Sequence, residues 1–169
     1  LAALKTGTDL VYTCVPKINV QSTRAVSPNL IVIPLVDSKL TRGAVNKLLG
    51  QIPADLDSAT IGMGLSIQDP EALKLLVKSL LDRDVRLSLD ATALVSYILP
   101  LLSGKNVVVT PHAGEFKKMF GEAPPDSKKA RITMVEKFAK DHSITILLKG
   151  PTDIIDRKST RLNSSHALI

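Results

Sequence analysis

Short apolar runs alternate along the chain with longer segments in which apolar residues recur every three or four positions. The apolar runs cover residues 10–15, 30–35, 60–63, 85–89, 107–110 and 144–148. Several of them are almost continuously apolar, which is typical of strands that are covered on both faces of a sheet. The runs therefore predict the strands of a mostly parallel sheet.

The longer segments predict helices over Arg42–Leu49, Pro70–Leu81 and residues 127–140. Asp69 can cap the second helix, and Pro70 suits its first turn. Its inward face is expected to comprise Leu73, Leu76, Val77 and Leu80. In the last helix the inward positions are expected to be Ala130, Met134 and Phe138, with Ile132 beside them. Alternating strands and helices predict an α/β layered fold with a mostly parallel central sheet flanked by helices.

Composition is that of a globular protein with an aliphatic core. Of the 169 residues 44% are hydrophobic, only 3% are aromatic, and there is no Trp. No apolar run approaches the roughly 18 residues that suggest a membrane span, so we predict no membrane partner. The single cysteine, Cys14, sits in an apolar run and is expected to be a buried small hydrophobe. A reducing cytoplasm fits this cysteine usage.

The net charge of +6 raises the possibility of a nucleic-acid partner. Basic residues are scattered, however, as in Lys117-Lys118 and Lys128-Lys129, and no aromatic residues interleave with them for base stacking. Solvated helix faces are the preferred interpretation, and we predict no nucleic-acid partner.

Both ends of the chain differ from its middle. Residues 156–169 are polar and aperiodic, and they resemble the translation of a common sequencing-adapter read; an ordinary disordered terminus is the alternative. Residues 1–5 have the pattern of a helix interior without a cap. We therefore expect residues 1–155 to be one partial domain, cut at both ends, followed by a non-native tail at 156–169.

Four consecutive predicted strands end in glycine or polar residues, and in a parallel sheet such ends meet at one edge, where ligands bind. Gly62 and Gly64 follow the third run. They allow a ligand to approach the backbone closely, although a tight turn without function is at least as plausible. Asp90 follows the fourth run. It positions a ligand, a metal or a loop in one interpretation, and caps a helix starting near Ala91 in the other.

The fifth and sixth runs lead into the two most informative motifs, Thr110-Pro111-His112-Ala113-Gly114-Glu115 and Lys149-Gly150-Pro151-Thr152-Asp153. In the first, Thr110 and His112 can face a cleft, and Glu115 suits the first turn of a helix. A lone histidine is more often structural than catalytic, but its place at a strand end favours function. In the second, a cation, a glycine and a hydroxyl on one turn suit phosphate. The alternative is a β-turn with a solvated Lys149.

Taken in order, these motifs resemble those of the NAD(P)H-hydrate dehydratase family, which has a ribokinase-like fold. That family carries Gly-Pro-Gly, Leu-Asp-Ala-Asp-Ala-Leu, Thr-Pro-His-x-Gly-Glu and Lys-Gly-x-x-Thr/Asp. The corresponding segments here are Gly62-Met63-Gly64, Leu89-Asp90-Ala91-Thr92-Ala93-Leu94, residues 110–115 and residues 149–153. Met63 replaces a proline and Thr92 an aspartate, so the chain departs from the family pattern at those two places.

The resemblance implies a reaction in which water leaves the hydrated nicotinamide ring of NADHX or NADPHX, driven by hydrolysis of ADP or ATP with Mg²⁺. It implies that Gly64 and His112 contact the hydrate and that Lys149, Gly150, Pro151, Thr152 and Asp153 line the nucleotide. Gly62, Asp90, Thr110 and Glu115 would support them. It also implies a homo-oligomer in the intact protein.

No catalytic residue and no metal ligand is assigned to this chain. The family's Gly-x-Gly-Asp motif supplies the base that activates the acceptor hydroxyl, and nothing in residues 156–169 matches it. The polypeptide as written is therefore expected to be inactive. The alternatives are a small-molecule kinase of the same superfamily, acting on a vitamin or a sugar, and a non-catalytic nucleotide-binding module. ADP and ATP are not distinguished by the sequence.

Overall fold

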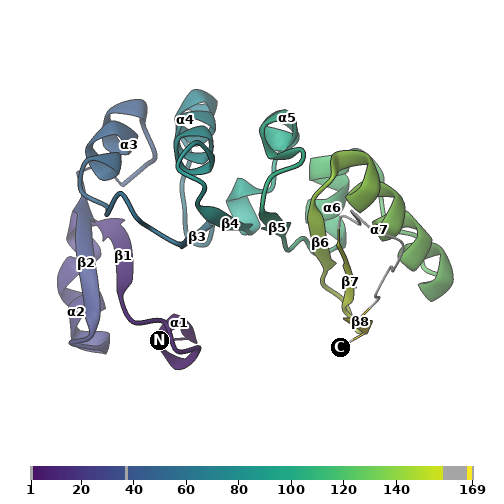
Figure 1. Ribbon diagram of the computed structural model, residues 1–169, viewed down its shortest axis with the longest axis horizontal. Coiled ribbons are helices and arrows are strands. Elements are labelled where there is room, and N and C mark those ends of the chain that lie inside the picture. Colours follow the sequence, from purple (N-terminus) through teal and green to yellow (C-terminus); the bar gives the residue numbers. More distant parts are fainter. Residues whose placement is uncertain (1, 37, 158–166, 169) are drawn as a thin grey trace. The chain divides into compact units, whose positions relative to one another are not determined.

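Strands and helices alternate along the chain up to residue 148, as the apolar pattern predicts (Figure 1). The computed structural model describes residues 2–36, 38–157 and 167–168. It divides into two units, one of Leu1–Ala54 with Ser66–Leu76 and the other of Asp55–Leu65 with Val77–Ile169. Helix α4, Pro70–Leu81, contributes residues to both units.

The first unit is built on a sheet of two parallel strands, β1 (Val11–Pro16) and β2 (Leu30–Leu35). Helix α2 (Val20–Val26) packs on this sheet, and α3 (Arg42–Leu49) packs on β2. The Thr41 hydroxyl accepts a hydrogen bond from the backbone N–H of Ala44 at 3.2 Å and so caps α3. The remaining short helices of this unit are α1 (Ala2–Lys5) and the 3-10 helix η1 (Lys17–Asn19).

Cys14, predicted to be buried, is exposed, so that prediction was wrong. The physical reason is the small size of this sheet. An apolar run is covered on both faces only where helices lie on both sides. Here β1 has no fully buried residue, and in β2 only Val32 and Ile33 are buried.

The second unit is built on a six-stranded sheet with its strands in sequence order (Figure 1). Neighbouring strands are parallel from the first to the fourth and antiparallel thereafter. The strands are β3 (Ser58–Ile61), β4 (Arg86–Leu89), β5 (Val107–Val109), β6 (Thr145–Leu148), β7 (Ile154–Asp156) and β8 (Ala167–Leu168). The predicted α/β class with a mostly parallel, helix-flanked sheet is confirmed.

The helices of the second unit follow the strands that they connect. Between β4 and β5 lie η2 (Ala91–Ala93), η3 (Ser96–Ile98) and α5 (Leu99–Leu102). Between β5 and β6 lie α6 (Ala113–Phe120) and α7 (Lys128–His142), and α7 packs on β6 and β7. Central strand residues such as Leu89, Val109 and Ile146 are fully buried, so the core of this unit lies on the parallel strands.

Helix α4 forms as predicted. The Asp69 carboxylate accepts a hydrogen bond from the backbone N–H of Glu71 at 2.9 Å, and Pro70 is the first helical residue. The four residues predicted for its inward face are all buried, namely Leu73, Leu76, Val77 and Leu80.

Helix α7 presents a face that overlaps the predicted one, with Phe138 and Ile132 half-buried, but is shifted by about one position. Met134 is buried as expected, but Ala130 is exposed, while Val135 and Ala139 are buried. With 3.6 residues per turn, the contact stripe passes through positions 131, 134, 135, 138 and 139. Ala130 lies one position outside that stripe, whereas half-buried Arg131 begins it.

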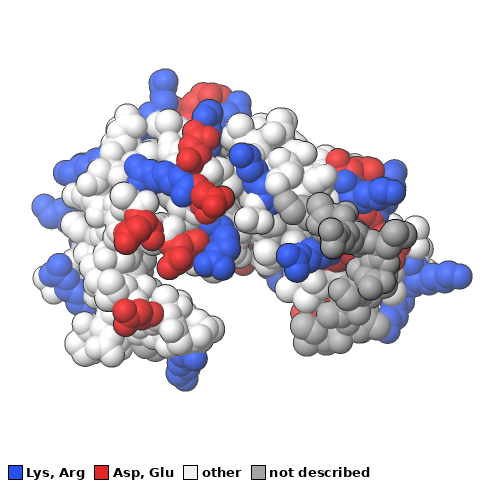
Figure 2. All heavy atoms as spheres, viewed as in Figure 1, with Lys and Arg blue, Asp and Glu red and all other residues white. Residues whose placement is uncertain are grey.

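The predicted tail at 156–169 falls mostly on residues 158–166 and 169, which lie outside the described residues. Asp156 ends β7, opposite Ile146 of β6. Within the described residues, no helix combines the length and apolar character needed to cross a bilayer. On the face shown in Figure 2, Lys and Arg are interspersed with Asp and Glu instead of forming one basic area.

Candidate functional site

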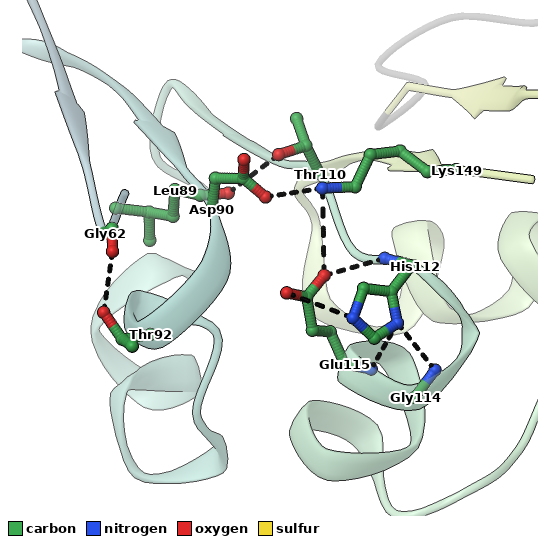
Figure 3. A network of polar contacts seen from close by, with 9 residues as sticks. All are labelled: Gly62, Leu89, Asp90, Thr92, Thr110, His112, Gly114, Glu115 and Lys149. Carbon is green, nitrogen blue, oxygen red and sulfur yellow. Dashed lines mark hydrogen bonds and ion pairs between the residues drawn. The ribbon is translucent and has the colours of Figure 1, made fainter. Parts of the chain in front are cut away.

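The four parallel strands of the second unit end side by side, and the residues that follow them form the candidate site (Figure 3). Backbone hydrogen bonds continue one or two residues beyond the strands and fix this alignment. They run from Asp90 N–H to Ile61 C=O (3.0 Å), from Thr110 N–H to Leu89 C=O (3.0 Å), and from Lys149 N–H to Pro111 C=O (2.8 Å). The predicted convergence of the strand ends at one sheet edge is confirmed.

Gly62 is required by the close approach of two strand ends. Its φ is +126°, and a Cβ at this position would lie 1.7 Å from the carbonyl oxygen of Asp90. Only a residue without a side chain fits there. Gly64 also has a positive φ, +66°, but nothing lies within 4 Å of its Cβ position. The first glycine therefore serves the packing of the edge, and the second presents an open backbone.

Thr92 holds the turn that contains these glycines. Its Oγ1 donates toward the carbonyl oxygens of Gly62 at 2.7 Å and of Leu65 at 2.8 Å. The Leu65 N–H returns to the Gly62 carbonyl oxygen at 3.2 Å and closes the turn. Sequence reasoning recognised Thr92 only as a departure from a motif. The signal that could have found it is a hydroxyl side chain two residues after a strand-end carboxylate.

Asp90 pairs with Lys149, a residue 59 positions away, through an Oδ1–Nζ distance of 2.7 Å. Its side chain makes no capping hydrogen bond to the short helix η2, so the capping alternative does not hold. Burial on its own would raise the pKa of Asp90. The hydrogen bond from Lys149, supported by the Ala91 backbone and the Thr110 hydroxyl, outweighs that effect and lowers the pKa below its ordinary value.

Lys149 lies between two carboxylates. Besides Asp90, it faces Glu115, whose Oε2 lies 3.8 Å from Nζ (Figure 3). All three side chains are partly shielded, with 38% of Lys149, 23% of Asp90 and 18% of Glu115 exposed. The solvated Lys149 of the β-turn alternative is therefore not what the structure has, because its ammonium is already neutralised from two sides.

His112 begins helix α6 and caps it. Its Nδ1 accepts hydrogen bonds from the backbone N–H groups of Gly114 (3.0 Å) and Glu115 (3.3 Å), and Glu115 Oε2 accepts from the His112 N–H (2.9 Å). These bonds form a capping box. A Cβ at Gly114 would lie 3.0 Å from the imidazole Cε1, so a small residue there leaves room for the cap.

The cap fixes how the imidazole of His112 can meet a ligand. Since Nδ1 accepts two hydrogen bonds, the proton of the neutral ring is on Nε2. Nε2 lies 3.4 Å from Glu115 Oε1, and 59% of the side chain is exposed. The ring can therefore donate from Nε2 to a ligand oxygen while it caps the helix, so the structural and functional interpretations are compatible.

Residues 149–153 form the turn that joins antiparallel strands β6 and β7. Asp153 closes the turn, because its Oδ1 accepts from the Gly150 N–H at 2.9 Å. Gly150 and Pro151 are exposed, and Thr152 is half-buried. The β-turn alternative is thus correct as geometry, and it leaves the backbone of the turn accessible to a ligand.

The described residues do not form a site that could hold a divalent cation by protein side chains alone, before a phosphate-bearing ligand binds. No group of three or more His, Cys, Asp or Glu side chains in this part of the chain has metal-binding geometry. Asp90 and Glu115 both face the Lys149 ammonium, and Asp153 accepts a hydrogen bond within its own turn. Mg²⁺ usually keeps waters and shares one or two carboxylates with substrate phosphates, and these carboxylates are already engaged.

A sheet edge of this kind, with strand ends that present glycine and polar residues, places the chain among the α/β proteins, in which such an edge is the usual ligand site. Its fold is ribokinase-like. A solved ribokinase-like superfamily protein from Enterococcus faecalis has a TM-score of 0.64 at 20% identity, over 92% of this chain and 52% of that one. An ADP/ATP-dependent NAD(P)H-hydrate dehydratase from Bacillus subtilis, co-crystallized with ATP/Mg²⁺ and soaked with CoA, has a TM-score of 0.66 at 21% identity. The match covers 90% of this chain and 53% of that one.

The chain belongs to the NAD(P)H-hydrate dehydratase family, whose model matches residues 1–165. It is 72% identical over 160 residues to the ADP-dependent (S)-NAD(P)H-hydrate dehydratase of Nitrosopumilus maritimus. That match covers 95% of this chain and 56% of the relative, so the chain spans about half the length of this curated protein. The resemblance inferred from the four motifs is confirmed.

Proposed function

We propose that this chain forms the hydrate- and nucleotide-binding part of an ADP-dependent NAD(P)H-hydrate dehydratase. The observation that carries the proposal is that four motifs far apart in the sequence meet at one sheet edge. The contacts that join them are those of Gly62 with Thr92, Asp90 with Lys149, and Lys149 with Glu115. The 72% identical relative is named as ADP-dependent, which favours ADP over ATP.

In this proposal the hydrated nicotinamide lies between the open backbone at Gly64 and the imidazole of His112. The Gly64 turn offers space, because nothing lies within 4 Å of its Cβ position. Nε2 of His112 donates a hydrogen bond to an oxygen of the hydrate, while its Nδ1 stays engaged in the cap. The imidazole ring thus orients the substrate, and its Nδ1 does not act as a base that removes a proton from the substrate.

The adenine nucleotide lies along the turn of Lys149, Gly150, Pro151, Thr152 and Asp153. Its hydrolysis drives the loss of water: the ring hydroxyl is phosphorylated and then eliminated, regenerating NADH or NADPH with AMP and phosphate from ADP. Mg²⁺ would enter with the nucleotide phosphates, since the carboxylates of this edge are already paired. The cytoplasmic location and the homo-oligomer remain predictions of the same proposal.

A chimera tests this function directly. Residues 1–155 of this chain replace the matching segment of the Nitrosopumilus maritimus dehydratase, and NADHX is supplied with ADP, with ATP or without nucleotide. We expect NADH absorbance to return only with nucleotide, and faster with ADP. A chimera that is folded but inactive, while the parent dehydratase works, overturns the proposal. Phosphorylation of a vitamin or sugar in place of dehydration would support the small-molecule kinase.

A further inference from the structure

Arg131, in the first turns of α7, lies beside the turn at residues 149–153. Its Nη1 and Nη2 are 3.5 Å and 3.6 Å from the position that a Cβ would occupy at Gly150. Because glycine has no side chain, the guanidinium lies against bare backbone. Arg131 begins the contact stripe of α7, and it is half-buried, whereas its neighbours Lys128 and Lys129 are exposed.

The guanidinium of Arg131 lacks an acceptor at one of its donors. Its Nε is buried and has no hydrogen-bond partner among the described residues. Arginine is always charged and has five donors, so a buried and unpaired Nε is costly. Asp153 is on the adjacent turn, but its Oδ1 accepts from the Gly150 N–H and closes that turn. The charged guanidinium therefore lies beside the turn without an acceptor at Nε among the described residues.

Lys149, the cation that the sequence assigns to the nucleotide, is not free to neutralise phosphate. Asp90 lies 2.7 Å from its Nζ and Glu115 lies 3.8 Å away. Two carboxylates against one ammonium leave this part of the edge with a net negative charge. An anionic ligand on the turn needs a further cation, and Arg131 is close to the turn and unpaired at Nε.

We propose that Arg131 binds a phosphate group of the adenine nucleotide beside Gly150, where its Nη1 and Nη2 lie 3.5 Å and 3.6 Å from the position of a Cβ. The inference rests on the proposed function and adds to it a binding residue outside the four motifs. A guanidinium presents two parallel N–H donors that match two phosphate oxygens, and such charge-assisted pairs are stronger than neutral ones. Lys149 then serves the structure of the edge, because it joins the ends of β4, β5 and β6 through its carboxylate partners.

The test compares ADP with adenosine, which differs from it by lacking the phosphates. Both are titrated calorimetrically into the wild-type 169-residue chain, Arg131→Gln and the control Lys129→Gln. Arg131→Gln is expected to weaken ADP binding at least about tenfold and to leave adenosine binding unchanged. Lys129→Gln removes the same charge from an exposed position of α7, and it should change ADP affinity less than about twofold in physiological salt.

The outcomes separate this inference from the function on which it rests. If Arg131→Gln binds ADP as tightly as the wild type does, the role of Arg131 is overturned but the proposed function is not. The same holds if the variant loses equal affinity for ADP and for adenosine. A wild-type chain that binds no ADP, together with an inactive chimera, overturns the proposed function as well. If Arg131→Gln does not fold, Arg131→Lys keeps the charge but loses the planar fork. It should raise the KM for ADP of the chimera and leave its KM for NADHX unchanged.

Discussion

The ammonium of Lys149 lies 2.7 Å from the carboxylate of Asp90, although the two residues are 59 positions apart and follow different strands. Strand β5 lies between β4 and β6, so this pair spans the end of a central strand. Together with Glu115, it connects three of the four motifs. The pair therefore stabilises the edge on which the proposed site depends.

Asp90→Asn should lower stability at neutral pH by about 1 kcal/mol or less, because the pair is partly exposed. The pKa of Asp90 is lowered in the folded protein from its ordinary value of 3.8. Its contribution is therefore fully present above that ordinary value and is lost as the pH falls through the lowered pKa. Urea unfolding of wild type and variant, at neutral pH and in acid, measures this difference.

The two proteins should converge in stability at a pH below the lowered pKa of Asp90. Asp82→Asn is the matched control, since Asp82, just after α4, forms an exposed ion pair with Lys78 of that helix at 2.5 Å. It should cost less than about 0.5 kcal/mol. If the difference in unfolding free energy between wild type and Asp90→Asn stays the same in acid, the pairing of Asp90 with Lys149 is contradicted.

Gly62→Ala should be far more disruptive than Gly64→Ala. At Gly62 a Cβ would lie 1.7 Å from the Asp90 carbonyl oxygen, so the strand ends must separate. At Gly64 the space is open, and only the positive φ of +66° is unfavourable. We expect losses of about 3 kcal/mol or more and of about 1 kcal/mol, respectively, in thermal or urea unfolding. Equal losses would argue against the close approach of Gly62 and Asp90.

The existence and order of the strands could be predicted from apolarity, but their ends could not. The run at 60–63 predicted a strand that includes Met63, whereas β3 is Ser58–Ile61. The positive φ of Gly62 ends the strand, and Met63 is 60% exposed. Apolar character indicates burial only where a neighbouring element supplies cover, which is also why Cys14 was assigned wrongly.

The members of the site could be predicted from the sequence, but their partners could not. A motif placed Asp90, His112 and Lys149 at strand ends, because parallel strands align their carboxyl ends. The sequence could not predict that Lys149 pairs with Asp90 or that His112 caps a helix through Nδ1. Both contacts depend on side-chain geometry, which the spacing of residues does not specify. Thr92 was the least predictable residue, because its hydroxyl acts on carbonyl groups of a loop 27 and 30 residues earlier in the chain.

Thr92→Val should loosen the turn at Gly62–Leu65 without leaving a cavity, since valine has nearly the same shape. It removes the hydroxyl that reaches the Gly62 and Leu65 carbonyl oxygens. A cost of about 1–2 kcal/mol follows from the lost hydrogen bonds. Amide exchange at Leu65, whose N–H bonds to Gly62, should accelerate. Thr92→Ser keeps the hydroxyl and should keep the slow exchange; fast exchange in both variants would show that the hydroxyl is not the cause.

His112 has two roles that substitution can separate. Asparagine is a good N-cap residue, so His112→Asn should retain the stability of α6 to within about 0.5 kcal/mol, whereas His112→Ala should lose about 1 kcal/mol. Both variants lack Nε2, which in the proposed function donates a hydrogen bond to the hydrate. In the chimera, both should therefore raise the KM for NADHX to a similar degree and leave the KM for ADP unchanged.

The comparison of stability with kinetics decides which role His112 has. A KM for NADHX that follows stability, normal in His112→Asn and raised in His112→Ala, would reduce the histidine to a helix cap. A KM raised in both variants while only His112→Ala is less stable requires direct contact with the substrate. Glu115→Gln is the control, because an amide oxygen can still accept from the His112 N–H and complete the capping box. It leaves the His112 side chain itself unchanged while it removes one of the two charges that face Lys149.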